Sequence, residues 1–162
     1  MSKKIVVILC FLISLSGCIH TEKISIDDIE TEDTQVKLEI TGGYELVKYD
    51  VFLSDDNRVF AYDAREKPEG ATVLSVDDVS DLHMLKLCIE ELQNCEKETV
   101  DFHLPASDAY LVNMYINGNL YSFEYGCARN PYANILTEIM LSYSDVEGLE
   151  NVKSYISTIR KN

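Results

Sequence analysis

The side chains best able to do chemistry in this chain are its five cysteines, three histidines and many carboxylates. The histidines His20, His83 and His103 lie far apart in the sequence, and none has the spacing of a zinc motif. The adjacent Asp55 and Asp56 lack the fixed ligand positions and central glycine of a calcium loop. We therefore expect no metal site and no cofactor, and we interpret these groups as turn, cap or surface residues.

Nucleophilic catalysis has equally little support in the sequence. The chain contains no Gly-x-Ser-x-Gly elbow, no Ser-x-x-Lys pair and no phosphate-binding loop. A thiol or acid–base centre would need groups that only the fold brings together, and spacing alone cannot choose them. We expect a non-enzymatic protein, with a small hydrolase as the alternative.

The amino-terminal residues carry the most specific pattern. Lys3 and Lys4 precede an apolar run from Ile5 to Leu15, which Leu15-Ser16-Gly17-Cys18 closes. A basic start, an apolar stretch of about 7–15 residues and a small-residue exit are typical of a secretory signal peptide. The run is shorter than the roughly 20 apolar residues of a membrane span. The closing quartet resembles the lipobox of bacterial lipoproteins.

This resemblance implies that residues 1–17 are removed and that Cys18 is lipidated, by palmitate and related acyl chains. Two or more chains anchor a protein stably, whereas one chain binds a membrane only marginally. Ile19 stands where inner-membrane lipoproteins of enteric bacteria carry aspartate. The resemblance therefore implies an outer-membrane protein that faces the periplasm and contacts the membrane through Cys18.

Residues 18–34 are expected to form the lipidated cysteine and an acidic tether, with weak support for a short strand at Lys23–Ile26. The chain has 14 Lys and Arg against 28 Asp and Glu, a net charge of −14. Such a charge argues against nucleic acid as a partner, because phosphates are neutralised by Lys and Arg. It permits a basic protein partner. Residues 35–162 are expected to form one domain.

Two hairpins and three helices are expected in this domain. Asp55-Asp56-Asn57 and Asn117-Gly118 supply the hairpin turns. The expected strands are residues 35–41, 44–53, 58–62, 109–116 and 120–125. The first expected helix runs from a capping box at Ser75–Asp78 to Asn94–Glu96. The second runs from Asn130-Pro131 to about Met140. The third begins at Asp145, after the capping box Ser144-x-x-Glu147, and ends at about Ile159.

This pattern predicts an α+β fold of order β-ββ-α-ββ-α-α, a two-layer sandwich of antiparallel hairpins packed against helices. The layout resembles small bacterial envelope domains of the α+β class. That likeness rests on Gly42-Gly43-Tyr44, the strand Tyr49–Leu53 and the turn after it.

The cysteines of the domain predict one disulfide. Cys88 and Cys95 are separated on a continuous helix by about 10.5 Å of rise, beyond the limit of about 7 Å between Cα atoms. Cys127 follows the second hairpin, near the expected helix end. Since the periplasm is oxidising, we predict a Cys95–Cys127 disulfide and a buried Cys88 thiol.

Tyrosines crowd the second hairpin, and this residue type is favoured at interfaces. We expect Tyr115, Tyr121 and Tyr125 to share one sheet face and to form a binding surface together with Asp55 and Asp56. The alternative is that they pack under the helices. The expected function is a binding module for an envelope protein partner. The alternatives are an inhibitor or immunity-like protein against an envelope-attacking enzyme, a periplasmic hydrolase, and a structural lipoprotein that helps to assemble other envelope proteins.

Overall fold

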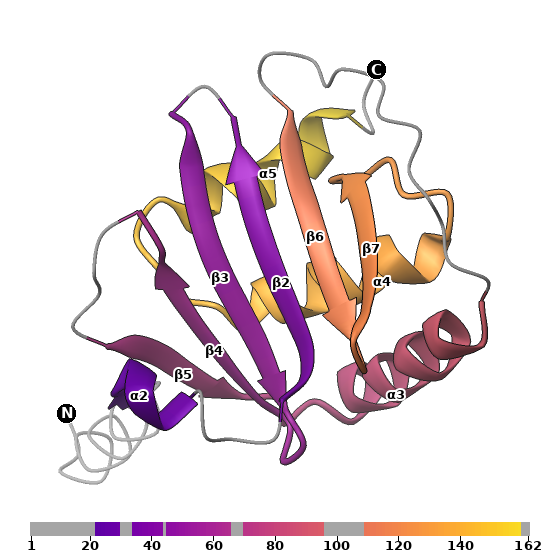
Figure 1. The fold of residues 1–162 in the computed structure, drawn as a ribbon, viewed down its shortest axis with the longest axis horizontal. Helices are drawn as coiled ribbons and strands as arrows, with labels where there is room; N and C mark the ends of the chain where they lie inside the picture. Colours follow the sequence, from indigo (N-terminus) through magenta and orange to yellow (C-terminus); the bar gives the residue numbers. More distant parts are fainter. Residues whose placement is uncertain (1–21, 30–33, 44, 66–69, 96–108, 160–162) are drawn as a thin grey trace, which may run out of the picture.

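Seven antiparallel strands form one sheet in the computed structural model, which describes residues 22–29, 34–43, 45–65, 70–95 and 109–159. The strand order across the sheet is β1-β5-β4-β3-β2-β6-β7 (Figure 1). The strands are β1 (Glu22–Ile24), β2 (Thr34–Gly42), β3 (Val47–Ser54), β4 (Arg58–Asp63), β5 (Ala71–Ser75), β6 (Tyr110–Ile116) and β7 (Asn119–Glu124). The predicted α+β class is confirmed.

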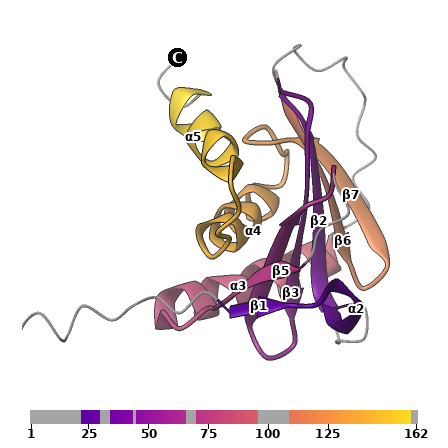
Figure 2. The same ribbon diagram turned by 90° about the vertical axis from the view of Figure 1, so that its left-hand side faces the viewer.

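Three helices lie on one face of the sheet: α3 (Val79–Asn94), α4 (Pro131–Ser142) and α5 (Leu149–Ile159) (Figures 1 and 2). The Tyr143 hydroxyl donates a hydrogen bond to Asp81 across 2.9 Å, which ties the end of α4 to the start of α3. The short helix α2 (Ile26–Ile29) lies on the other side of the sheet (Figure 2).

The alternation of β2 determines which of its side chains enter the core. Val36, Leu38 and Ile40 are fully buried beneath the helices, and they belong to the main hydrophobic cluster. Lys37 and Glu39, between them, project from the opposite face because successive strand residues alternate. The alternation predicted for this strand is thus confirmed.

Both predicted hairpins are present. Asn117 and Gly118 alone separate β6 from β7, and both have positive φ, 48° and 77°. Two left-handed residues match the right-handed twist of a hairpin, which is why Asn-Gly is favoured there. The turn between β3 and β4 uses Asn57, whose φ is 64°.

The helix ends agree in part with the prediction. Asp78 is the N-cap of α3 and accepts hydrogen bonds from the amides of Ser80 and Asp81. Asn130 caps α4, with Pro131 at its first position, as predicted. The predicted cap at Ser75 is wrong, because Ser75 ends β5.

The predicted start of the last helix at Asp145 is also wrong, because α5 begins at Leu149. The Ser144 hydroxyl donates to the Met140 carbonyl across 2.8 Å instead of capping a new helix.

The predicted element order omitted two strands. β5 follows the loop after β4 and pairs with it, so that Phe60 lies opposite Val73. The sequence pattern predicted no strand for these five residues, of which only Ser75 was used, in the predicted helix cap. β1 pairs with β5 at the edge of the sheet, where Ile24 lies opposite Ala71. It overlaps the weakly supported strand at Lys23–Ile26.

Part of the predicted tether therefore belongs to the sheet. Ile29 of α2 is buried in a second hydrophobic cluster with Phe60, Ala71 and Val73, on the face away from α3, α4 and α5. Residues 22–29 thus pack on the domain, whereas Cys18 and the lipobox lie outside the described residues. Among the described residues, no helix combines the length and the apolar character needed to cross a membrane.

Candidate binding face

The sheet face opposite α3, α4 and α5, called the open face below, carries two rows of side chains. Strand register sets Lys37 on β2 opposite Phe52 on β3 and Tyr115 on β6. Two residues along β2, Glu39 lies opposite Asp50 of β3. An aromatic row with a lysine at its centre, Tyr115–Lys37–Phe52, therefore runs beside a row of carboxylates.

Lys37 connects the two rows. Its Nζ donates a hydrogen bond to Glu39 Oε1 across 2.7 Å and lies 3.8 Å from Asp50 Oδ2. The same Nζ lies 5.5 Å from the ring centroid of Phe52 and 5.8 Å from that of Tyr115. Both distances are within the roughly 6 Å over which a ring quadrupole attracts a cation. One ammonium group thus contacts two carboxylates and two rings.

Two tyrosine hydroxyls complete the polar row. Tyr115 donates to Glu39 Oε2 across 3.1 Å, and Tyr62 of β4 donates to Asp50 Oδ2 across 3.2 Å. Asp50 is only 8% exposed, and its Oδ1 accepts no hydrogen bond from a described residue. A buried oxygen without a donor is costly, so Asp50 depends on the charge of Lys37.

The electrostatics keep Lys37 and Glu39 ionised. Burial acts to lower the pKa of Lys37, but the hydrogen bond to Glu39 and the charges of Asp50 and Glu39 raise it above 10.5. Burial acts to raise the pKa of Glu39, but the hydrogen bonds from Lys37 and Tyr115 and the charge of Lys37 lower it below 4.5. Lys37 is therefore an ammonium at neutral pH, suited to binding and not to nucleophilic attack.

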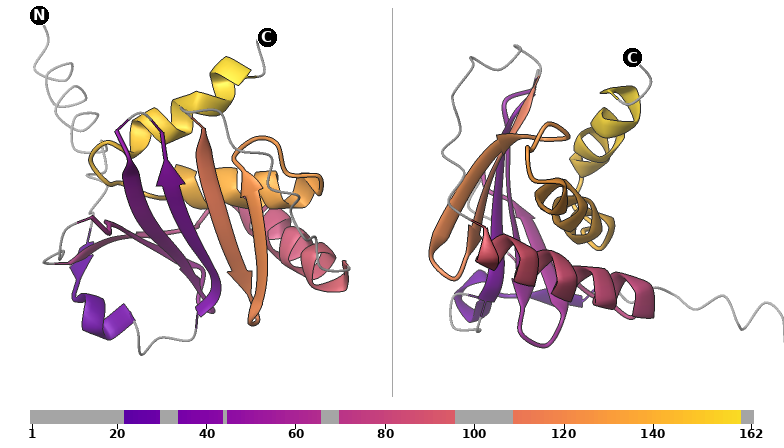
Figure 3. Two further views of the ribbon diagram at one scale, coloured as in Figure 1. Left: turned by 45° about the horizontal axis from the view of Figure 1, so that its top comes forward. Right: turned by 90° about the vertical axis from the view of Figure 1, so that its right-hand side faces the viewer.

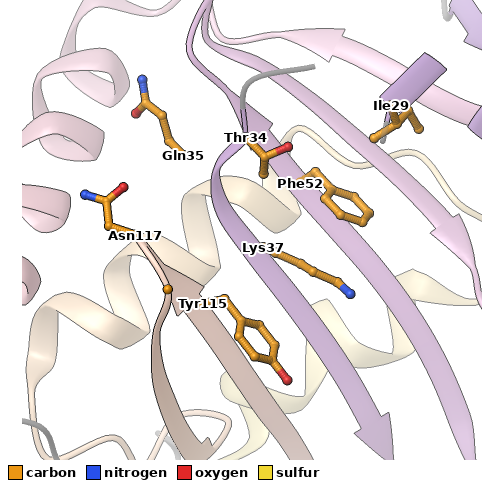
Figure 4. Close-up of a pocket in the computed structure, with 8 residues that line it drawn as sticks. Ile29, Thr34, Gln35, Lys37, Phe52, Tyr115 and Asn117 are labelled. Atoms are coloured by element: carbon orange, nitrogen blue, oxygen red, sulfur yellow. The ribbon is translucent and has the colours of Figure 1, made fainter. Parts of the chain in front are cut away.

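A hollow of about 340 Å³ lies at the end of the open face where β2 begins. Its lining includes the rings of Phe52 and Tyr115, which lie on either side of Lys37 in Figure 4. The described lining also includes Ile29, Thr34, Gln35, Asn117 and Gly118. The Gln35 and Asn117 side chains point away from the two rings in Figure 4. The hollow therefore has the composition of many binding sites, aromatic walls with a few polar groups.

A bulge shapes this hollow. The pairing of β2 with β3 shifts register between Thr34 and Val36, so that one extra residue is accommodated on β2. Thr34 and Gln35 both line the hollow, and their side chains point apart in Figure 4.

Of the predicted tyrosines, only Tyr115 lies on the open face. Tyr121 is 4% exposed and Tyr125 is 2% exposed, both in the core beneath the helices. The two-residue turn pairs Tyr115 with Leu120 and Met114 with Tyr121, which sets Tyr121 on the covered face. The Tyr121 hydroxyl donates to the Leu92 carbonyl across 2.7 Å. The prediction is therefore wrong for Tyr121 and Tyr125.

Asp55 and Asp56 lie in the exposed turn between β3 and β4, as predicted. Asp56 accepts hydrogen bonds from Ser54 Oγ across 2.5 Å and from Arg58 Nε across 2.6 Å. The bond from Ser54, followed by that from Arg58, lowers the pKa of Asp56. Asp56 thus fixes the turn, and Asp55 is the more available of the two. Since β2 pairs with both β3 and β6, this turn and Asn117–Gly118 lie at the same end of the sheet.

The predicted disulfide is absent from the structure, because Cys88, Cys95 and Cys127 are free thiols. Cys95 is the C-cap of α3, and its sulfur accepts a hydrogen bond from Asn130 Nδ2 across 3.2 Å. It therefore faces the N-cap of α4 instead of Cys127. Cys88 is buried as predicted, and burial raises its pKa to about 11. Burial and the charge of Glu124 also raise the pKa of Cys127, which disfavours a reactive thiolate.

The described residues contain no group of three His, Cys, Asp or Glu side chains that could hold a metal ion. His83 is exposed on α3. His20 and His103 lie outside the described residues. The alternative of a histidine centre therefore gains no geometric support from the part of the chain that the structure describes.

Sequence reasoning missed Lys37, Phe52, Asp50 and Tyr62 as site residues. The signal was available for the first two, since both occupy polar-face positions of strands whose alternation is clear. The bulge before Val36 and the pairing of β3 with β4 follow from three-dimensional register, which spacing alone does not fix.

The chain was compared with models of protein families, with curated proteins and with solved structures. None of the three comparisons gave a match.

Proposed function

We propose that this protein is a lipid-anchored binding module of the bacterial cell envelope, which holds its partner on the open face. The observation that carries the proposal is the paired-charge and aromatic cluster around Lys37, beside a hollow. Aromatic side chains gathered on an open sheet face are typical of interaction surfaces. In this proposal the helices form one layer that packs against one face of the sheet, and the partner binds the opposite face.

The proposal of a lipid anchor rests on the amino-terminal sequence pattern alone. In this proposal the anchor holds the module at the outer membrane, facing the periplasm. Metabolic labelling with a palmitate analogue tests it. Wild type and a Cys10→Ala variant should be labelled, because Cys10 lies in the removed segment, whereas Cys18→Ala should not be labelled. Equal labelling of Cys18→Ala would contradict the anchor.

Binding accounts for the open face better than hydrolysis does. Lys37 pairs with both Glu39 and Asp50, and this pairing moves the pKa of Lys37 and of Glu39 away from neutrality. A general acid or base works best with a pKa near the working pH. The cluster therefore suits fixed electrostatic contacts.

A second candidate is an inhibitor or immunity-like protein that binds a basic envelope-attacking enzyme. The net charge of −14 and the exposed acidic turn at Asp55 favour it. The test is a direct inhibition assay with a cationic lysozyme at two salt concentrations. Inhibition that weakens with salt and with Asp55→Asn would support this candidate, and no inhibition at low salt would exclude it for that enzyme.

The proposal is tested by chemical crosslinking of the full-length protein in its native envelope. Wild type should capture a partner that Phe52→Ala and Tyr115→Ala reduce several-fold. Lys86→Met, an exposed change on α3, should capture as much partner as wild type. A partner captured equally by all four proteins would contradict the open face as the binding surface.

A further inference from the structure

The edge strand β1 limits how far the domain can stand from the proposed lipid anchor. Glu22 of β1 lies opposite Val73 of β5, and Glu22 is only four residues after Cys18 in the sequence. Four residues of fully extended chain span at most about 14 Å. A free tether from Cys18 to Thr34 would span roughly 50 Å. The pairing of β1 therefore keeps this edge of the domain close to the lipidated residue.

Packing beside β1 makes this part of the chain a fixed part of the sheet edge. Ile24 packs against the second hydrophobic cluster, and Ile29 of α2 is 2% exposed within that cluster. The chain also approaches β5 closely, because a side-chain carbon at Gly70 would lie only 2.8 Å from the Ile24 carbonyl oxygen. β1 and α2 lie together at this edge in Figure 2. The domain, and not a flexible arm, therefore begins at residue 22.

One line of paired residues measures the distance from this edge to the binding cluster. Strand register places in line, across β1, β5, β4, β3 and β2, the residues Glu22, Val73, Phe60, Phe52 and Lys37. The line continues through Tyr115 of β6 to Leu120 of β7, the opposite edge of the sheet in Figure 1. Neighbouring strands are about 4.8 Å apart, so Lys37 lies roughly 19 Å and Leu120 roughly 29 Å from Glu22 along the sheet.

The charge of the chain also separates this edge from the rest of the domain. The net charge is −14, so an anionic bilayer repels the domain as a whole. Lys23 is an exposed cation on β1, and headgroup phosphates attract such a side chain. The short connection to Cys18 holds the β1 edge at the lipid against the general repulsion, which acts on the remaining surface.

We infer that the β1 edge of the sheet is the membrane-facing edge of the domain, and that β7 is presented away from the lipid. This inference rests on the proposed lipid anchor and adds the orientation of the anchored module. It sets the cluster around Lys37 within about 33 Å of Cys18, so a partner is bound close to the bilayer surface.

The test measures energy transfer to the membrane from two positions of the full-length, lipidated protein. A fluorescent amino acid replaces Ser75 at the end of β5 in one protein and Leu120 on β7 in another, and both side chains are exposed. Each protein is reconstituted into vesicles of phosphatidylethanolamine and phosphatidylglycerol that contain an acceptor linked to a lipid headgroup. Transfer from position 75 should exceed transfer from position 120 at least twofold.

A longer connection to Cys18 provides the matched control. Roughly 20 Gly and Ser residues inserted between Ile19 and His20 add about 25 Å of mean reach. Transfer from position 75 should then fall toward that from position 120, because the β1 edge is no longer confined. Equal transfer from the two positions without the insertion would overturn the inference, as would transfer from position 75 that the insertion leaves unchanged.

Metabolic labelling distinguishes failure of this inference from failure of the anchor. If Cys18 does not incorporate the palmitate analogue, the proposed anchor fails and the inference fails with it. If Cys18 is labelled but the two positions give equal transfer, the membrane-facing edge is wrong, and the proposed anchored binding module stands.

Discussion

The two faces of the same sheet are built from the same strands but with different chemistry. On the covered face, β2 contributes Val36, Leu38 and Ile40, all fully buried against helices. On the open face, the residues between them are Lys37 and Glu39, half-buried in a network of charges, rings and hydroxyls. The covered face is apolar at β2, whereas the open face is polar and hollowed around Lys37 and carries the second hydrophobic cluster, with Ile29 and Phe60, farther along the sheet.

This difference shows that alternate residues of one strand affect different properties. Residues on the covered face determine stability, and residues on the open face are available for binding. A side chain that is moved by one position along a strand points to the other face. It then affects binding instead of stability, or the reverse. Substitutions on the covered face should change unfolding and leave binding by the folded molecules unaltered. Those on the open face should change binding with only small effects on unfolding. The following predictions test that separation, beginning with the largest effect.

The largest effect is expected from truncation of the covered face. Leu38→Ala removes a fully buried side chain and leaves a cavity, so it should lower the free energy of unfolding by about 3 kcal/mol. Urea unfolding followed by circular dichroism measures this loss. A loss below about 1 kcal/mol would show that the covered face is not close-packed at β2.

A matched pair of tyrosines compares the two faces directly. Tyr121→Phe removes a buried hydrogen bond to the Leu92 carbonyl and leaves that acceptor unsatisfied, at a cost of about 1–2 kcal/mol. Tyr115→Phe removes a half-exposed bond to Glu39 and should cost less than about 0.5 kcal/mol. Equal losses in urea unfolding would contradict the assignment of these residues to different faces.

Removal of the central cation should have an intermediate effect on stability. Lys37→Met leaves Glu39 and Asp50 facing each other without a counter-charge. Because the Lys37 side chain is 31% exposed, solvent screens this repulsion and the expected loss is about 1 kcal/mol. Adding Glu39→Gln to Lys37→Met should recover part of it. Lys86→Met, on the exposed side of α3, should stay within about 0.5 kcal/mol of wild type.

The smallest effect is a pH dependence of the ion pair. The folded pKa of Glu39 is below 4.5, so its stabilisation is present above that value and is lost as pH falls through the folded pKa. The folded pKa of Lys37 is above 10.5, so its stabilisation is present below that value and is lost as pH rises through the folded pKa.

The stability difference between wild type and Glu39→Gln should therefore be constant between about pH 6 and pH 9 and shrink in acid. Urea midpoints of both proteins across this range measure it. A difference that grows on acidification would contradict the assigned pairing.

The sequence predicted local features of the fold well. The Asn117-Gly118 turn, the caps at Asn130 and Pro131 and the alternation of β2 follow from backbone preferences within a few residues. It failed where a distant partner decides the outcome. β5 is a strand because it pairs with β4, and β1 is a strand because it pairs with β5. Ser144 bonds back to α4, and α5 begins later than predicted.

The candidate site was predicted only at Tyr115 and the turn at Asp55. Counting outward from the Asn117-Gly118 turn would have set Tyr121 opposite Met114 and therefore in the core. The cluster around Lys37 combines residues from β2, β3, β4 and β6, and only the strand order brings them together. That order, visible in Figure 3 as one continuous sheet, is a tertiary property.

Site-specific photocrosslinking in the native envelope tests the central claim most directly. A photoreactive phenylalanine analogue replaces Tyr115 on the open face in one protein and Lys86 on α3 in another, with all else unchanged. The account predicts a crosslinked product from position 115 and none from position 86. A product from position 86 alone would show that the helices, and not the open face, receive the partner.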